Sequence, residues 1–241
     1  MKMILKTGLA SAMLSAAFTL SAAADNLIVN GNFSDGFNGF TSGYTQVTAP
    51  YPGSPNGMWA EETYTVWDDP ADTHSLWQPI PSGNPYNSVN GQMLIVNGSQ
   101  NDAKYVWQTS AAIDVEIGQD YYFQAIVTNL HPVNGVALNG AKLTYQYSYD
   151  GSSWTSLGTD DLTGSTSGVW QISDEFVITD ISSGSVYLRI ANSQTALAGN
   201  DFAIGLINFD TGPIPVPEPG VSILLTGAGM VLMVFRRRKS R

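Results

Sequence analysis

The sequence predicts an all-β domain that folds as a two-sheet antiparallel β-sandwich of jelly-roll type. Between Asp25 and Asp210 helical periodicity is hard to find, whereas apolar and polar residues alternate with a period of two, as in half-buried strands. Clusters of Gly, Asn, Ser and Asp separate these stretches and mark turns. About ten short strands separated by such turns are typical of sandwiches.

The predicted strands are spread along the whole of this region. In chain order they are Leu27–Phe33, Met58–Trp67, Gln92–Val96, Tyr105–Val115, Tyr121–Val127, Leu143–Tyr149, Trp170–Ile178, Val186–Ile190 and Asp201–Phe209. After Tyr149, the Asp150-Gly151 pair predicts a hairpin turn that the aspartate caps. No internal repeat or linker interrupts residues 25–210, so we expect one domain.

The charge balance of this region excludes one class of partner. Only Lys104, Lys142 and Arg189 are basic between Asp25 and Val216, against nineteen acidic residues, which gives a net charge near −16. Such a domain repels phosphate backbones, so we expect no nucleic acid as a partner. The chain has no cysteine, which excludes disulfide and thiol chemistry.

Residues 1–24 have the composition of a secretory signal peptide. Lys2 and Lys6 precede an apolar stretch, and small residues ending at Ala24 come directly before Asp25. We therefore expect signal peptidase to cut before Asp25 and the domain to be exported across the inner membrane. A permanent N-terminal anchor is the alternative.

The C-terminal segment combines three features. Residues 211–219 are a proline-rich stalk, residues 220–235 an uncharged apolar stretch, and residues 236–241 a basic end. The apolar stretch is shorter than the roughly 20 residues of a full span, but its position predicts a short transmembrane helix. The arginines predict that its end is cytoplasmic.

This segment resembles the PEP-CTERM sorting signal of exopolysaccharide-producing Gram-negative bacteria. Pro217, Glu218 and Pro219 form the matching tripeptide. The resemblance implies recognition and cleavage by an exosortase, after transient anchoring in the membrane, with the protein then at the cell surface or in the extracellular matrix. A plain membrane anchor is the alternative.

Three stretches of the domain resemble galactose-binding-like jelly rolls. They are Asn30-Gly31-Asn32-Phe33 leading to Gly39-Phe40, Gly91–Gly98 followed by Val106–Thr109 and Tyr121–Phe123, and Gly199–Ile204. The chain departs from that pattern at three places. Ser34 replaces the usual acidic residue of the opening, Gly205-Leu206 replaces the usual aspartate pair, and Phe40 stands for a tryptophan.

The departures concern the calcium site that the resemblance would imply. Calcium needs about six to eight oxygen ligands. Ser34, Gly205 and Leu206 remove the expected carboxylates, which leaves Asp35 and Asp201 as imperfect substitutes. We therefore expect no metal, and folding without calcium.

The densest polar cluster lies further along the chain and consists of Asp68, Asp69, Asp72 and His74. Its spacing fits no EF-hand, and a zinc site would need more histidine or a cysteine. An exposed acidic loop around Pro70 is the favoured interpretation, and a hard-cation loop is the alternative.

Little in the sequence indicates enzyme chemistry. His74 and His131 are its only histidines, and no Gly-x-Ser-x-Gly motif is present. Glu61 and Glu62 could supply a glycosidase carboxylate, but neighbours on one strand face opposite sides and cannot pair by themselves. We therefore expect no catalytic residue and no cofactor.

Aromatic residues gather between Trp59 and Trp77, among acids and amides. An exposed flat ring beside polar groups suits a pyranose, whose faces are apolar and whose hydroxyls need hydrogen bonds. We take Trp59, Trp67 and Trp77 as the candidate ligand-binding residues. Core packing is the other interpretation. On one strand, Trp59 and Trp67 would lie on the same face and Tyr64 on the opposite face, so these aromatic residues would not all share one exposed side.

These features together predict an exported, non-catalytic surface or matrix protein that binds carbohydrate, with exopolysaccharide as the expected partner. The alternative is a structural matrix or adhesion component without a small ligand. A glycoside hydrolase is the third possibility, and it would need a pair of carboxylates in one cleft.

Overall fold

The computed structural model describes residues 26–48, 57–101, 104–196 and 198–215. The predicted signal peptide, the Pro217–Pro219 motif, the apolar stretch 220–235 and the basic end lie outside the described residues. Within the described ranges, no helix is long and apolar enough to cross a membrane.

The described residues form thirteen strands and one short 3₁₀ helix. In chain order they are β1 (Phe40–Thr41), β2 (Thr45–Gln46), β3 (Thr63–Trp67), η1 (Pro70–Asp72), β4 (Met93–Asn97), β5 (Lys104–Thr109), β6 (Ile113–Asp114), β7 (Tyr121–Asn129), β8 (Lys142–Ser148), β9 (Thr155–Asp161), β10 (Gln171–Ile172), β11 (Phe176–Ile178), β12 (Ser185–Asn192) and β13 (Phe202–Asp210).

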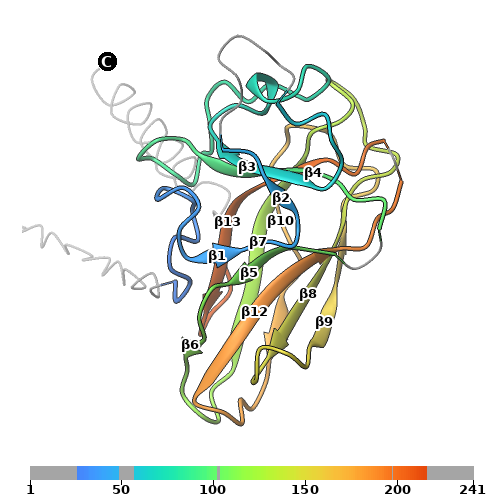
Figure 1. Cartoon of the computed structure of the whole chain (residues 1–241). Helices are drawn as coiled ribbons and strands as arrows, with labels where there is room; N and C mark the ends of the chain where they lie inside the picture. Colours follow the sequence, from blue (N-terminus) through green and yellow to red (C-terminus); the bar gives the residue numbers. More distant parts are fainter. Residues whose placement is uncertain (1–25, 49–56, 102–103, 197, 216–241) are drawn as a thin grey trace, which may run out of the picture.

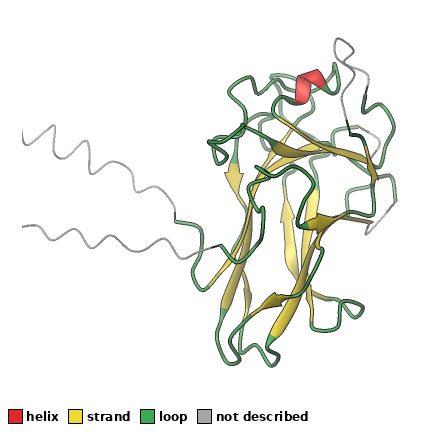
Figure 2. Ribbon diagram, turned by 60° about the vertical axis from the view of Figure 1, so that its left-hand side comes forward, coloured by secondary structure: helices red, strands yellow, loops and turns green. Residues whose placement is uncertain are grey.

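The strands form two sheets that stack face to face, which confirms the predicted β-sandwich (Figure 1, Figure 2). One sheet has the order β1-β5-β12-β8-β9, with β6 also paired to β12. The other has the order β10-β7-β13-β4-β3-β2, with β11 also paired to β7. The chain crosses between the sheets repeatedly, as after β4, β7 and β12. Every strand pair of the described chain is antiparallel except β2 with β3.

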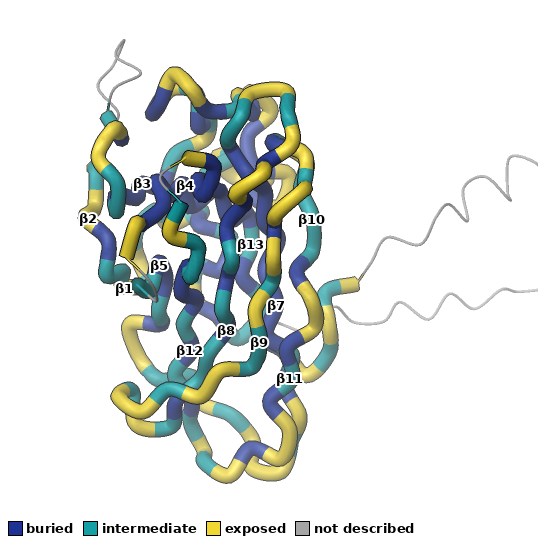
Figure 3. The backbone as a smooth tube through the Cα atoms, turned by 90° about the vertical axis from the view of Figure 1, so that its right-hand side faces the viewer, coloured by how far each residue is buried: buried dark blue, intermediate teal, exposed yellow. Residues whose placement is uncertain are grey.

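The main core lies between the sheets, as the period-two alternation predicts. On β8, Leu143 and Tyr145 are completely buried, whereas the Thr144 hydroxyl faces outward and bonds to the Thr159 hydroxyl at 2.9 Å. Phe123 from the opposite sheet meets the Tyr145 ring edge-on, with 5.1 Å between ring centroids. In Figure 3, most buried residues lie in the strands and most exposed residues lie in the loops.

A second apolar cluster covers the outer face of the larger sheet. On β4, Leu94 and Val96 belong to the main core and Met93 and Ile95 to this cluster, because alternate residues of a strand face opposite sides. Its buried members are Met58, Trp77, Ile80, Met93, Ile95, Leu130 and Ala203. The long β3–β4 loop, residues 68–92, supplies Trp77 and Ile80, so this loop is packed onto the sheet.

Several predicted strand boundaries are wrong. Residues 27–33 form turns rather than a strand, since Asn30 and Phe33 have positive φ values of 57° and 62°. The strand predicted from Met58 begins only at Thr63, because Glu62 has a φ of 61° and breaks the extended chain. The stretch 105–115 divides into β5 and β6, and 170–178 into β10 and β11.

The predicted hairpin between β8 and β9 is confirmed. The Asp150 carboxylate accepts hydrogen bonds from the backbone N–H groups of Ser152 and Ser153, at 2.8 and 2.7 Å. These bonds, the Ser153 N–H first, lower the pKa of Asp150, so the carboxylate caps the turn in its ionised form.

Candidate functional site

A cleft of about 170 Å³ opens where five segments far apart in the sequence meet. The segments are the chain before β3, the β3–β4 loop, the end of β4, the chain after β7 and the loop that leads into β13. Figure 1 shows these segments close together at one end of the sandwich. The lining residues are Trp59, Glu61, His74, Leu76, Asn97, His131, Ala198 and Asp201. One of the three candidate tryptophans, Trp59, therefore lies in the cleft wall.

Trp59 is half exposed, at 50%, and sits on a segment that is fixed on both sides. The neighbouring Met58 is fully buried, its N–H donates to Thr73 O at 3.2 Å, and its carbonyl accepts from the Asn97 side chain. On the other side, the Glu62 N–H donates to Gly98 O at 3.1 Å. The backbone that carries the half-exposed indole is therefore held on both sides.

His74 lies directly behind the Trp59 ring. The two ring centroids are 4.2 Å apart, and on its far side His74 stacks on Trp77 at 4.6 Å with an interplanar angle of 24°. The Leu76 N–H donates to His74 Nδ1 at 3.2 Å, and burial lowers the pKa of His74. The imidazole is therefore neutral near neutral pH and serves as a spacer between the two indoles.

Trp77 does not offer a ring to a ligand, which corrects its assignment as a ligand-binding residue. It is 1% exposed, and its Nε1–H donates to Asp201 Oδ2 at 3.1 Å. A ring enclosed by the second apolar cluster has no face left for a sugar. Its role is to pack the β3–β4 loop onto the sheet and to hold Asp201.

Trp67 also lies apart from the cleft. It is partly buried against the second apolar cluster and is absent from the cleft lining. In the β3–β4 register, Asn97 pairs with Thr63 whereas Trp67 pairs with Met93. Trp67 is four residues from Thr63 along β3, which is about 13 Å at 3.3 Å per residue. The three tryptophans do not form one platform.

Glu61 is the carboxylate in the cleft wall that forms no salt bridge with a described lysine or arginine. Burial, and then the negative charges of Asp201 and Glu62, raise its pKa to about 7. The Glu61 Oε2 atom is enclosed and has no hydrogen-bond partner among the described residues. In the described part of the chain, Oε2 therefore lacks a donor, and the charges that shift the Glu61 pKa are negative.

Glu62 has the opposite environment. Its carboxylate accepts from the Lys104 ammonium and from the side chains of Asn101 and Ser99. The Lys104 hydrogen bond is the largest cause that lowers the Glu62 pKa to about 2. The two adjacent glutamates therefore differ in environment, and both lie before β3 rather than on one strand as predicted.

Asp201 shares the cleft with Glu61, but both of its oxygens are engaged. Oδ1 accepts from the Gly98 N–H and Oδ2 from the Trp77 indole, each at 3.1 Å. The side chain is 7% exposed, and burial raises its pKa. Two carboxylates therefore line one cleft, and among the described residues Glu61 keeps an oxygen without a hydrogen bond whereas Asp201 does not.

A second depression, of about 220 Å³, adjoins the cleft at His131 and Ala198. It continues along the β7–β8 loop past Val136 and Leu138, which are 47% and 80% exposed. The two depressions together extend the concave surface beyond one ring-sized site. His131 and Asn97, which the sequence did not single out as ligand contacts, gain this position only through the fold.

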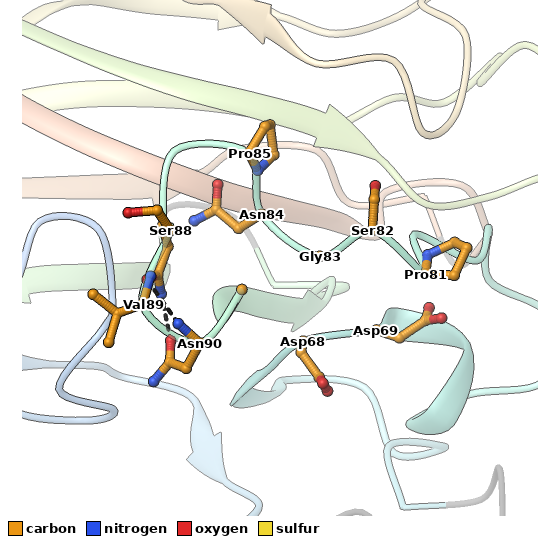
Figure 4. A pocket seen from close by; sticks show the side chains of 12 residues that line it. Asp68, Asp69, Pro81, Ser82, Gly83, Asn84, Pro85, Ser88, Val89 and Asn90 are labelled. Carbon is orange, nitrogen blue, oxygen red and sulfur yellow. Dashed lines mark hydrogen bonds between the residues drawn. The ribbon is translucent and has the colours of Figure 1, made fainter.

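The predicted polar cluster of the β3–β4 loop is not brought together. Asp68 and Asp69 line a separate loop depression of about 430 Å³ and point away from each other (Figure 4). Asp69 Oδ1 accepts from the N–H groups of Ala71 and Ile80, so it shapes the loop. His74 belongs instead to the cleft. Among the described residues, no three His, Asp or Glu side chains form a metal-binding group.

The two carboxylates considered for calcium also lie apart. The opening loop bonds to β13 at Ile207, whose N–H donates to Gly31 O at 2.8 Å, whereas Asp201 precedes β13 at its other end. At Gly205 the β13–β7 register shifts, and the Asn84 side chain donates to Gly205 O at 2.6 Å. Gly205 thus admits a loop residue at the place where the resemblance implies an aspartate.

No family model and no curated protein matches the chain. Similar solved structures include a "Family 16 Carbohydrate Binding Module-2", with 12% identity, 76% of this chain and 99% of that chain covered, and a TM-score of 0.37. A CBM4 structure has 13% identity and a TM-score of 0.39, and the match covers 76% of this chain and 98% of that chain. A CBM22-1–CBM22-2 tandem domain from Paenibacillus barcinonensis has 12% identity and a TM-score of 0.45, and the match covers 85% of this chain and 50% of that chain. The strand order and register, rather than these similarities, define the fold.

Proposed function

We propose that the protein is a carbohydrate-binding domain and that the cleft beside Trp59 holds a sugar. The half-exposed Trp59 ring at the cleft wall is the observation that carries this proposal. A flat indole packs against the apolar face of a pyranose, and the polar groups of Glu61, Asn97 and His131 lie around it for the hydroxyls.

The ring is also ordered before a ligand arrives. The backbone of Met58 and Glu62 and the imidazole of His74 hold it, so little conformational freedom remains to be lost on binding. The adjoining depression beyond His131 extends the concave surface, which suits a polymer rather than a single sugar.

The expected affinity of one site is modest. Covering about 100 Å² of the indole contributes about 2.5 kcal/mol at about 25 cal/mol per Å². Ordering of the sugar offsets part of this, so one site should bind with a dissociation constant between about millimolar and tens of micromolar. Many copies in a matrix would retain one polymer much more tightly through avidity.

The test is titration of soluble oligosaccharides and retention on insoluble polysaccharides. Trp59→Ala should weaken binding by about tenfold or more, because it removes the apolar platform. Trp154→Ala is the matched control. The Trp154 ring lies under the Arg189 guanidinium, in the turn between β8 and β9, and this turn is at the opposite end of β8 from the cleft. Equal affinity of both variants would place the sugar site elsewhere, and no binding by the wild type would favour a structural role.

The proposed role is non-catalytic, because Asp201 is engaged by Trp77 and Gly98 and leaves Glu61 without a second carboxylate. Incubation with the polysaccharides that the protein retains should release no new reducing ends. A release that Glu61→Gln abolishes would instead identify a glycoside hydrolase.

We further propose that the chain is exported and sorted through its C-terminal segment, on the strength of residues 1–24 and the Pro217–Arg241 pattern. In a host with the sorting enzyme, intact-mass measurement of the surface fraction should show a protein that lacks Arg236–Arg241. A surface fraction that retains Arg241 would indicate a plain membrane anchor.

A further inference from the structure

The Glu61 side chain is more than a generic polar group in the cleft. Its Oε2 is enclosed without a hydrogen-bond partner in the described part of the chain, and its nearest charges, Asp201 and Glu62, are also negative. Lys104, which could compensate it, is bonded to Glu62. The carboxylate lies beside Trp59 in the wall of a cleft that a ligand can enter.

Within the described ranges, no other lysine or arginine is available to Glu61. Of the three basic residues in the described ranges, Lys142 pairs with Asp161 at 3.1 Å and Arg189 donates to Gln146 while covering Trp154. His131 lines the same cleft, and its proximity adds to the burial that lowers the pKa of the neutral His74. The charge of His131 also lowers the pKa of Asp201, against the burial that raises it.

This electrostatic environment discriminates between classes of sugar. A uronic acid or a sulfated sugar would bring a second negative charge to Glu61 and would be repelled. A neutral sugar could donate hydroxyl hydrogen bonds but would bring no positive charge to stabilise the ionised form of Glu61. A protonated amine supplies strong donors and the missing charge together, and it is also attracted to the face of an indole.

We propose that the cleft selects sugars that carry a protonated amine, with Glu61 as the acceptor of the ammonium group and Trp59 as the platform for the ring. The chemical class is a hexosamine with a free amine, as in a partly deacetylated amino-sugar polymer. The proposal rests on the proposed sugar-binding function and adds the identity of the substituent that the site selects.

The experiment compares three oligomers of equal length and linkage that differ in one substituent on the second ring carbon. Oligomers of glucose, N-acetylglucosamine and glucosamine present a hydroxyl, an acetamido group and an ammonium group there. Titration of the full-length protein near neutral pH should give the glucosamine oligomer about tenfold higher affinity than either of the others, as a charge-assisted hydrogen bond requires. In Glu61→Gln the ratio between the glucosamine and glucose oligomers should fall to about one.

A matched variant controls for attraction of a polycation to an acidic protein. Asp114→Asn removes one negative charge on exposed β6, outside the cleft, and should keep the tenfold preference. Equal loss of preference in both variants would show unspecific charge attraction and overturn the proposal. Equal binding of the three oligomers by the wild type would overturn it too while leaving the sugar-binding function standing, and binding of none would overturn both.

Discussion

At the scale of single residues, the cleft depends on a tryptophan that does not itself line it. Trp77 stacks on His74 and bonds to Asp201, so it fixes two members of the cleft wall at once. The strand-parity argument could not separate Trp59 from Trp67. It assumed a strand from Met58, whereas Glu62 turns the chain with a φ of 61° and leaves Trp59 on a separate segment.

Trp77→Phe tests this arrangement. Phenylalanine keeps an aromatic ring but cannot donate to Asp201, which leaves a buried carboxylate oxygen unsatisfied at a cost of about 1.5–3 kcal/mol. For a domain of this size, the melting temperature should fall by about 3–12 °C in thermal unfolding monitored by circular dichroism.

Trp59→Phe is the control for Trp77→Phe, since its ring is half exposed and the change should alter the melting temperature by only about 1–2 °C. If both variants melted at the wild-type temperature, the bond between Trp77 and Asp201 would contribute nothing measurable to stability.

At the scale of elements, strands with one buried face were predictable and strands without one were not. Leu143–Tyr149 and Val186–Ile190 alternate cleanly and coincide with β8 and β12. The edge strand β9 was missed, because its residues are exposed or half-buried along its whole length and leave no alternation to detect. The packed β3–β4 loop was missed for another reason: its contacts with β13 are distant in sequence, as between Asn84 and Gly205.

Gly205→Ala should loosen this loop. A β-carbon at this position would lie 2.7 Å from Asn84 Oδ1 and 3.1 Å from the Trp170 ring, so Asn84 must withdraw from Gly205 O. We expect a loss of about 1–3 kcal/mol in the free energy of unfolding from this overpacking. Hydrogen exchange should increase in residues 82–92 before it increases in β7.

Gly184→Ala is the matched control, because a β-carbon there meets no atom within 4 Å. It should be neutral or slightly stabilising. Equal stability of the two variants would mean that the loop is not anchored at Gly205.

At the scale of the whole molecule, independence from calcium remains a prediction. The opening loop already uses its own polar groups, since the Asn30 side chain donates to the carbonyls of Gly36 and Asn38 and accepts from the Asp35 N–H. A calcium ion at a hundred times its dissociation constant would add about 2.7 kcal/mol of stability. The melting temperature should be the same with a chelator and with millimolar calcium, and a fall of several degrees on chelation would reveal a site.

The described carboxylates whose pKa is shifted fall into two groups with opposite effects on the pH dependence of stability. Hydrogen bonds, from Lys104 to Glu62 and from Thr163 to Asp161, lower the pKa of each carboxyl in the folded state. Burial raises the pKa of Glu61 to about 7 and that of Asp160 to about 6. The first group stabilises the fold above its unfolded-state pKa near 4, and this stabilisation is lost as the pH falls toward about 2.

The second group acts at higher pH. Between about pH 4 and pH 7 the folded protein binds more protons at Glu61 and Asp160 than the unfolded chain does, so stability decreases as the pH rises. We therefore expect the melting temperature to be highest near pH 4–5, rather than at neutral pH. A series of thermal melts from about pH 2 to pH 8 measures this, and Glu61→Gln with Asp160→Asn should flatten the decline on the neutral side. A melting temperature that rises steadily to pH 7 in the wild type would contradict the raised pKa values of both side chains.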